Sequence, residues 1–280
     1  MPTVLVTGAA RGIGRAVVLR LERSGWDVVA GVRRQADGDA LRAARTGSIT
    51  PVLLDVTDEA QLAALPGALP AQLDAVVNNA GIVVGGPIEG LPLDELRRQM
   101  EVNVVGQVAV TQAVLPRLRE TRGRVVFISS LSGRVATPMT GAYNASKFAL
   151  EGMADSLRME LRPWRIPVSL IEPAQTDTAL WQDAEATLDE SLATLSPAHR
   201  DLYAGHIEGY RRSIPRSQKM ASPVDGVADA VEKALTARRP RARYVVGAGP
   251  RIQGVLARTT PTGVLDALLR AATGVPRRPT

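Results

Sequence analysis

The sequence predicts an α/β protein built on one parallel sheet, and two observations predict it. Short runs rich in Val, Ile and Leu recur along the chain, and their apolar character is continuous, which is typical of strands buried on both faces. Stretches with helical periodicity lie between most of these runs, and strand–helix–strand repetition indicates parallel pairing. We therefore expect a doubly wound, or Rossmann, sheet of about seven strands with helices on both faces. The expected strands are residues 3–7, 27–32, 51–55, 73–78, 124–129, 166–171 and 243–247.

Length and hydrophobic content predict one domain over residues 1–280. A chain of 280 residues that is 45% hydrophobic can bury one substantial core, and α/β domains of this length commonly stay undivided. The segment 176–222 interrupts the rhythm: it is long, polar and carries both histidines, so we expect a substrate-binding lid there. Residues 250–280 follow the last strand, and we expect a helical extension that either packs on the core or lies on a bilayer.

Composition excludes several classes of function. The chain has no cysteine, so a disulfide framework, a thiolate metal site and a thiol nucleophile are excluded. We expect a cytoplasmic protein, because no basic leader precedes an apolar stretch and no run of about 18 apolar residues occurs. A serine hydrolase is not expected, since the sequence contains no G-x-S-x-G elbow.

The net charge of +6 is concentrated in the last quarter of the chain. Residues 211–280 contain 14 Lys and Arg against 4 Asp and Glu, whereas residues 1–210 have more acidic than basic side chains. Such a region could favour anionic lipid, which would give peripheral membrane contact; the alternative is a solvated basic face. Nucleic acid is not expected, because the region has no recognisable DNA-binding helix pair and aromatic residues are only 3% of the chain.

A glycine-rich turn directly after the first expected strand gives the first functional prediction. The run is Thr7-Gly8-Ala9-Ala10-Arg11-Gly12-Ile13-Gly14, and a helical pattern begins after it. Gly8 permits a tight turn, Gly12 lets the backbone approach a pyrophosphate, and Gly14 lets the helix pack closely on the strand. The helix N-terminus then faces the phosphate charge. We expect residues 8 and 11–14 to bind a dinucleotide, the alternative being a turn that only caps the helix.

The end of the second expected strand indicates which dinucleotide this is. An acidic side chain there would bond the ribose 2′-hydroxyl of NAD, but this chain has Val32 followed by Arg33 and Arg34. Guanidinium groups pair well with phosphate oxygens, and Arg11 in the glycine loop supplies another one. We therefore expect NADP(H) in preference to NAD(H), with these arginines at the 2′-phosphate. The alternative for Arg33 and Arg34 is a solvated turn.

Polar residues also follow the third and fourth expected strands. Asp55-Val56 precedes a helix, and the carboxylate could cap that helix, contact the adenine amino group, or do both. Asn78-Asn79-Ala80-Gly81 closes the fourth strand, where the amides could tie neighbouring strand ends or line the adenine ribose. The expected cofactor contacts in these two segments are Asp55, Val56, Asn79, Ala80 and Gly81.

The run Tyr143-Asn144-Ala145-Ser146-Lys147 places a phenol and an ammonium one turn apart on the same face of an expected helix. A nearby cation stabilises the phenolate, so we expect the pKa of Tyr143 to fall below its ordinary value of about 10, toward the working pH of an acid/base catalyst. Ser130 ends the fifth expected strand, at the sheet edge where ligands bind, and could hold a substrate oxygen. Asn103 is a polar residue in the helical stretch 100–110, where helix packing is its alternative role.

Together and in this order, the motifs resemble those of the short-chain dehydrogenase/reductase family over nearly the whole chain, from Thr3 to about Gly249. The resemblance implies a catalytic tetrad of Asn103, Ser130, Tyr143 and Lys147. In such a tetrad the tyrosine is the acid/base, and the lysine binds the nicotinamide ribose and lowers the tyrosine pKa. The serine orients the substrate oxygen, and the asparagine holds a water of the proton relay. Family members usually assemble through the helices that carry the asparagine and the tyrosine, which implies a homodimer or homotetramer.

The segment after the sixth expected strand departs from the family pattern. The family commonly has Pro-Gly there, but in this chain Pro173 is followed by Ala174. The resemblance implies cofactor contacts by Pro173, Thr176 and Thr178, the last of them at the nicotinamide carboxamide. The run Ser-Leu-Arg-Met-Glu-Leu-Arg-Pro-Trp and the C-terminal extension are similar to members that act on steroids or retinoids, which implies an apolar substrate.

We therefore expect an NADP(H)-dependent oxidoreductase that interconverts an alcohol and a ketone or aldehyde, with Tyr143 as the acid/base. The alternative is a catalytically silent NADP(H)-binding sensor or scaffold, which would have no need of Tyr143, Lys147 and Ser130 together. Large side chains in the expected lid could cover an apolar substrate, although amphipathic packing explains them equally well. These side chains are Trp181, Leu188, Leu192, Leu195 and Tyr203.

Overall fold

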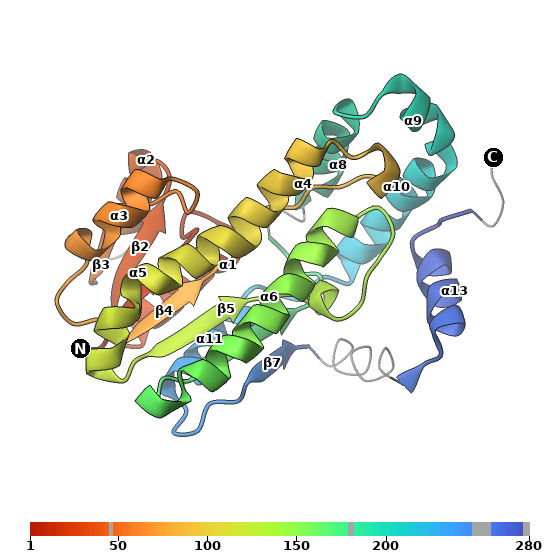
Figure 1. Cartoon of the computed structure of the whole chain (residues 1–280). Helices are drawn as coiled ribbons and strands as arrows, with labels where there is room; N and C mark the ends of the chain where they lie inside the picture. Colours follow the sequence, from red (N-terminus) through yellow and green to blue (C-terminus); the bar gives the residue numbers. More distant parts are fainter. Residues whose placement is uncertain (45–46, 179–181, 248–258, 277–280) are drawn as a thin grey trace.

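In the computed structural model, which describes residues 1–44, 47–178, 182–247 and 259–276, seven strands form one sheet (Figure 1). Their order is β3-β2-β1-β4-β5-β6-β7, and every neighbouring pair is parallel. The fold class expected from the sequence is thereby confirmed. The strands are β1 Thr3–Val6, β2 Asp27–Val32, β3 Ile49–Leu53, β4 Ala75–Asn78, β5 Arg124–Ile128, β6 Val168–Pro173 and β7 Arg243–Val246.

Helices cover both faces of the sheet because strand side chains alternate between two apolar cores. In β1, Val4 and Val6 point into one core and Leu5 into the other. The first core is closed by α1 (Gly12–Arg23), α2 (Gln35–Ala43) and α11 (Asp225–Thr236). The second is closed by α3 (Glu59–Ala68), α5 (Gly106–Thr121) and α6 (Gly141–Glu160). A further helix, α4 (Leu93–Met100), leads into α5 through a π-helical turn, Glu101–Val105.

The strand order reverses between β1 and β4. The chain runs outward from β1 to β3 and then returns to the other side of β1 as β4. In open α/β sheets such a reversal leaves a crevice at the carboxyl ends of the two strands, and ligands bind there. The glycine loop follows β1 and Asn79 follows β4, so the fold brings these two motifs to one crevice.

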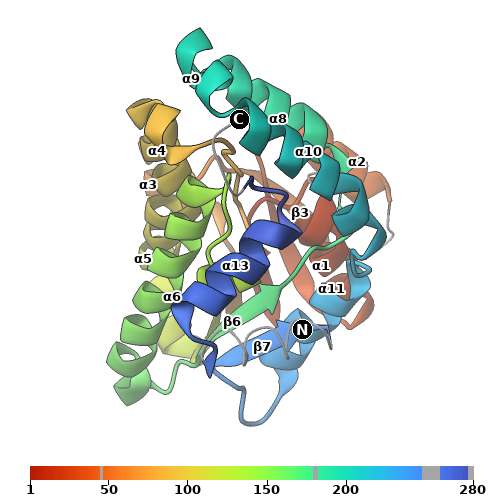
Figure 2. The same ribbon diagram turned by 90° about the vertical axis from the view of Figure 1, so that its right-hand side faces the viewer.

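Residues 182–222, called the lid segment below, contain three helices: α8 (Ala184–Ala193), α9 (Pro197–Leu202) and α10 (Ala204–Lys219). Figures 1 and 2 show them beyond the carboxyl edge of the sheet, next to α4. Leu188, Leu192 and Leu195 are buried against one another and Ile214, as the amphipathic-packing alternative requires. The hydroxyl of Tyr203 donates to Glu89 at 2.6 Å, while Trp181 lies outside the described residues.

The C-terminal extension contains one described helix, α13 (Thr262–Ala272), which lies on the surface in front of α6 in Figure 2. None of its residues is buried. The turn after α13 meets the lid segment so closely that a Cβ on Gly209 of α10 would overlap the backbone of Gly274. The apolar pair Val255-Leu256 lies outside the described residues. Within the described part of the chain, no helix is long and apolar enough to cross a membrane.

Candidate active site

The glycine loop has the backbone that its glycines permit. Gly8 and Gly12 adopt φ values of 62° and 55°, in the left-handed region where a side chain is strained. A Cβ on Gly14 would overlap the carbonyl oxygen of Gly8 and lie 2.6 Å from the amide nitrogen of Asn79. No described side chain caps the N-terminus of α1, where Arg11 stands at the cap position in extended conformation. The first N–H groups of α1 are therefore free to face an anion.

Thr7 and Asn79 fix this loop to the end of β4. The hydroxyl of Thr7 accepts the backbone N–H groups of Asn79 and Ala80, both at 3.0 Å. The side-chain amide of Asn79 donates in return to the carbonyl oxygens of Thr7 at 2.9 Å and Gly8 at 3.1 Å. Of the two roles that the sequence left open for Asn79, the structure shows the tie between strand ends. The hydroxyl of Thr7 is a functional group that the sequence reasoning missed.

The arginines after β2 differ in their availability. Arg34 forms a bidentate pair with Asp37, at 2.9 Å and 2.7 Å, and this pair lowers the pKa of the Asp37 carboxyl. The more distant charges of Arg33 and Arg11 act in the same direction, so all three guanidinium groups lie near one another. Arg11 and Arg33 are exposed and form no ion pair with a described residue. The structure thus leaves two of the three expected phosphate ligands uncommitted.

Asp55 does not cap the helix that follows it, which corrects one of its two expected roles. Its carboxylate accepts the backbone N–H and the hydroxyl of Thr57, at 3.0 Å and 2.8 Å. Asp58 caps α3 by accepting the N–H of Gln61 at 3.0 Å. The physical reason is spacing: a cap bonds the N–H two or three residues into the helix, and α3 begins at Glu59. Val56 is buried, and its backbone lies against Gly106 of α5.

The loop after β6 returns to the glycine loop. A Cβ on Gly12 would lie 3.4 Å from the Cβ of Thr178, an ordinary contact distance, so Thr178 lies directly beside the turn. Thr176 pairs with Ser222 of the lid segment in an isolated parallel bridge, and its hydroxyl donates to the carbonyl of Ala174 at 3.1 Å. Pro173 is the last residue of β6. The three expected contacts therefore lie along one loop, with Thr178 nearest the crevice.

The expected catalytic hydroxyls meet at the carboxyl end of β5. Ser130 follows this strand in extended conformation, and its hydroxyl accepts the N–H of Ser132 at 3.1 Å. Burial raises the pKa of Tyr143, and a hydrogen bond with Ser130 opposes that rise. We expected Lys147 to lower this pKa, but the pKa of Tyr143 lies above its ordinary value because of burial. The effect of Ser130 on this pKa places the two hydroxyls near each other.

Lys147 lies one turn beyond Tyr143 with its ammonium buried. Its Nζ donates to the carbonyl of Ile128 at 2.8 Å and lies 5.7 Å from the centre of the Tyr143 ring. Burial lowers the pKa of Lys147 to about 8, and the negative charge of Glu151 opposes this shift. The i, i+4 spacing of the sequence thus brings the two side chains together, with the ammonium directed at the strand backbone.

Asn103 lies in the π-helical turn between α4 and α5 and is fully buried. Its side chain bonds both backbone groups of Ile82, accepting at 2.8 Å and donating at 3.0 Å, and donates to Ser146 at 3.1 Å. Gln99 bonds Val84 N–H and Ile82 C=O in the same way, and Gln107 donates to the Ala80 carbonyl. These three amides, which we call the amide ladder, hold the segment 80–84 against the helices. The side chain of Asn103 thus joins the segment 80–84 to α6 through hydrogen bonds.

A buried ion-pair network extends from Lys147 along α6. Arg243 of β7 contacts Glu151 at 3.0 Å, Glu172 at 3.2 Å and Asp155 at 2.6 Å. Arg134 also pairs with Glu172 at 2.6 Å. Glu172 is completely buried, and burial followed by the charge of Glu151 raises its pKa. Sequence reasoning missed this network, because its members are single charged residues on separate elements.

A small apolar cavity of about 40 Å³ lies between the lid segment and the segment that leads into α6. Val83, Leu188 and Tyr210 line it, as does Thr140, which directly precedes the helix of Tyr143. The site thus combines a phosphate-facing loop, a phenol paired with a hydroxyl, and an apolar wall. This arrangement can bind a dinucleotide and move a proton to or from a substrate oxygen.

Comparison with known proteins agrees with this geometry. Residues 2–189 match the family model described as short chain dehydrogenase. The chain belongs to the short-chain dehydrogenase family. It is 34% identical to retinol dehydrogenase 5 of Mus musculus over 277 residues, covering 95% of this chain and 87% of the relative. It is 32% identical to an NADPH-dependent 3-dehydrocapnine reductase of Ornithobacterium rhinotracheale, with 88% of each chain covered.

The fold of this short-chain dehydrogenase is likewise shared with solved structures. A short-chain dehydrogenase from Streptomyces avermitilis superposes with a TM-score of 0.77 at 27% identity, covering 98% of both chains. Membership of the family makes the chain an oxidoreductase that binds a nicotinamide dinucleotide and acts on alcohol or carbonyl groups. The expected resemblance to retinol-type members is also confirmed.

Proposed function

We propose that this short-chain dehydrogenase is an NADP(H)-dependent enzyme that interconverts an alcohol and a ketone or aldehyde. The observation that carries the proposal is that Tyr143, Ser130 and Lys147 come together at the sheet edge that also carries the glycine loop. A silent sensor or scaffold would need the loop alone. The joint presence of the three catalytic side chains favours the enzyme.

The residues of the crevice fit a dinucleotide with a 2′-phosphate. The N-terminus of α1, which no described side chain caps, suits the pyrophosphate. Arg11 and Arg33, which are exposed and have no ion pair within the described part of the chain, suit the 2′-phosphate. Arg34 would have to share its guanidinium with Asp37. Thr178 would lie beside the nicotinamide end, next to Gly12. The NADPH dependence named for the Ornithobacterium relative also supports NADP(H).

In this proposal the nicotinamide supplies or accepts hydride, and the protein handles the proton. Tyr143 gives a proton to the substrate oxygen in reduction and takes it back in oxidation, while Ser130 donates a second hydrogen bond to that oxygen. Lys147, with its pKa of about 8, is cationic below that pH and favours the phenolate that forms. Asn103 fixes the helix turn beneath Ser146 and holds the segment 80–84 in place.

The substrate is proposed to be apolar, of steroid, retinoid or lipid type. The apolar side chains beside Thr140, from Val83, Leu188 and Tyr210, and the name of the retinol dehydrogenase relative support this choice. Assembly into a homodimer or homotetramer through α5 and α6 is proposed as well, since Val105, Phe148 and Met153 are 50%, 44% and 42% exposed on this side. A cytoplasmic location, with peripheral membrane contact through the basic C-terminal region, completes the proposal.

The test mixes purified protein with NADPH or NADH and a panel of apolar ketones and aldehydes. It follows the absorbance of the reduced nicotinamide ring. Tyr143→Phe should lower turnover by about 10²- to 10⁴-fold, whereas Tyr244→Phe, on β7, should leave it unchanged. Arg33→Ser should weaken NADPH binding about tenfold and leave NADH binding unchanged. Tight NADPH binding without turnover on any substrate, in either direction, would favour the sensor.

A further inference from the structure

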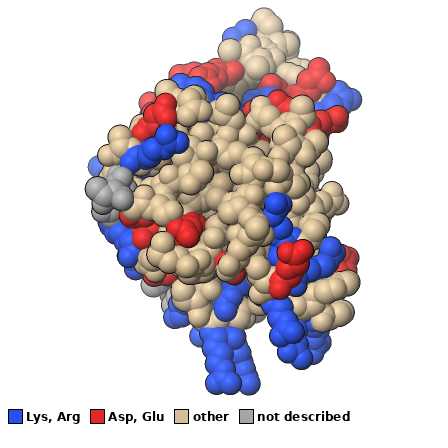
Figure 3. Space-filling view, turned by 90° about the vertical axis from the view of Figure 1, so that its left-hand side faces the viewer, with Lys and Arg blue, Asp and Glu red and all other residues tan. Residues whose placement is uncertain are grey.

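Basic side chains gather at the end of the molecule opposite the candidate active site. Figure 3 shows Lys and Arg projecting from its lower end, where Figure 1 has the C-terminal end of α6. The loop 237–242, between α11 and β7, contains the exposed Arg238, Arg239 and Arg241. Three of the 14 basic residues of 211–280 therefore lie in this one loop, next to the amino end of β7. The catalytic residues lie at the carboxyl ends of the strands, so this surface is separate from them.

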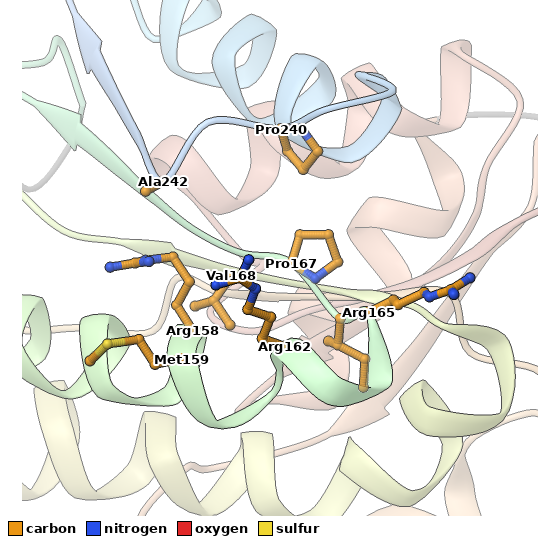
Figure 4. A pocket seen from close by; sticks show the side chains of 9 residues that line it. Arg158, Met159, Arg162, Arg165, Pro167, Val168, Pro240 and Ala242 are labelled. Carbon is orange, nitrogen blue, oxygen red and sulfur yellow. The ribbon is translucent and has the colours of Figure 1, made fainter.

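A groove of about 340 Å³ opens at this basic end, with walls from three parts of the fold (Figure 4). One wall is the end of α6 with the 3₁₀ turn Arg162–Trp164, and the other is the loop 237–242. Figure 4 shows Arg158 and Arg165 at the two ends of the groove and Arg162 between them. Val168, the first residue of β6, lies at its base. The volume is within the range of small-molecule sites.

The positive charge of the groove is largely uncompensated. Arg162 and Arg165 are exposed and form no ion pair with a described residue. Arg158 has Asp155 at 3.1 Å, but Arg243 holds the same carboxylate at 2.6 Å. Arg158 therefore contributes less free charge than Arg162 and Arg165, whose exposed guanidinium groups are available to an anionic group.

The remaining lining is apolar. Ile166, Pro167 and Pro240 contribute carbon surface between the arginines, together with Met159, Val168 and Ala242. A guanidinium fork binds two oxygens of one phosphate, whereas the carbon surface gains free energy by covering an apolar group. We propose that this groove binds a phosphate monoester whose apolar stem lies on this carbon surface, called the floor below. The phosphate can belong to a free metabolite or to the headgroup of a phospholipid.

The test uses hexyl phosphate and inorganic phosphate as soluble probes and titrates them into the full chain by calorimetry. Hexyl phosphate should bind saturably and about tenfold more tightly than inorganic phosphate, because only the ester covers the floor. Arg162→Gln with Arg165→Gln should weaken its binding about tenfold or more. The matched control is Arg42→Gln with Arg200→Gln, which removes the same charge from two exposed arginines outside the groove and outside the glycine loop. Unchanged thermal melting checks that both double variants are folded.

The outcomes separate the site and the source of the phosphate. Loss of binding in the groove variant but not in the control supports the proposal, and equal loss in both or loss only in the control overturns it. Equal affinity for the two soluble probes overturns the role of the floor, and absence of saturable binding overturns the free-metabolite source. Phosphatidylcholine vesicles containing phosphatidic acid then test the lipid source: binding that the groove variant loses supports it. No binding to vesicles or to hexyl phosphate overturns the proposal as a whole.

Discussion

Replacing Arg243 by methionine should destabilise the fold through the carboxylates that it leaves behind. The guanidinium contacts Glu151, Glu172 and Asp155, and the first two are at least nine-tenths buried. Removing one partner of a buried ion pair costs about 3–5 kcal/mol, while the part-exposed Asp155 adds about 1 kcal/mol or less. Because 24% of the Arg243 side chain is exposed, we expect the lower end, about 3 kcal/mol.

The free energy of unfolding lost in Arg243→Met should also depend on pH, and the structure determines the direction of this dependence. Burial already raises the pKa of Glu172 above its ordinary value of 4.5, and loss of Arg243 raises it further. When the pKa of a carboxyl is higher in the folded than in the unfolded protein, its contribution to stability is fully present below the pKa of the unfolded state. This contribution is lost as the pH rises through the pKa of the folded state. In Arg243→Met the penalty should therefore be smaller at about pH 5 than at about pH 8.

Urea unfolding followed by tryptophan fluorescence at the two pH values measures both effects. Arg241→Met, which removes an exposed guanidinium two residues away, is the control and should change the free energy of unfolding by less than about 0.5 kcal/mol. Adding Glu151→Gln to Arg243→Met should restore part of the loss, because Glu151 forms its ion pair with Arg243, whereas Glu172 keeps Arg134. An equal penalty at both pH values, or no rescue, would refute the electrostatic reasoning.

Three further outcomes can be checked by binding and unfolding measurements. Gly14→Ala should abolish measurable dinucleotide binding in a fluorescence titration and cost about 1–3 kcal/mol in urea, since its Cβ overlaps the Gly8 carbonyl; full binding would contradict the loop assignment. Thr7→Val should cost about 1–3 kcal/mol by the same unfolding assay, because it removes the acceptor of two backbone N–H groups. Lys147→Met should end turnover yet stabilise the fold by about 1–3 kcal/mol at about pH 7, because burial depresses the lysine pKa to about 8. That gain should shrink as the pH rises toward 10.5, the ordinary lysine value, and a variant no more stable than the parent at about pH 7 would contradict the burial argument.

Sequence patterns predicted the elements whose formation depends on residues close together in the chain. The seven strands were predictable because continuous apolar runs are required where both faces of a strand are buried, although β3 begins two residues before the expected 51–55. The glycine loop was predictable because each of its glycines meets a backbone requirement that arises within the eight residues from Thr7 to Gly14. The meeting of Tyr143 and Lys147 follows from helical spacing alone.

Parts that depend on competition between partners could not be predicted. Arg34 stays a proposed phosphate ligand, but its bidentate pair with Asp37, three residues away, was not predicted. The sequence left Asp55 open as a helix cap or an adenine contact. The choice between Asp55 and Asp58 as the cap depends on where α3 begins, and helix boundaries are poorly marked in sequence. The contact of Arg243 with Glu151 joins residues 92 positions apart, and no periodicity connects them.

The amide ladder has a consequence for how substrate choice can change. Gln99, Asn103 and Gln107 hold the segment 80–84 only through its main-chain N–H and C=O groups, which every residue type except proline provides. The side chains of Ile82 and Val83 can therefore be exchanged without releasing the segment, and Val83 lines the apolar cavity. The main-chain hydrogen bonds fix the position of the segment, and its side chains are left to set the shape and polarity of the cavity wall. Related enzymes can diversify at these positions, and a designer can randomise them, while the catalytic edge stays where it is.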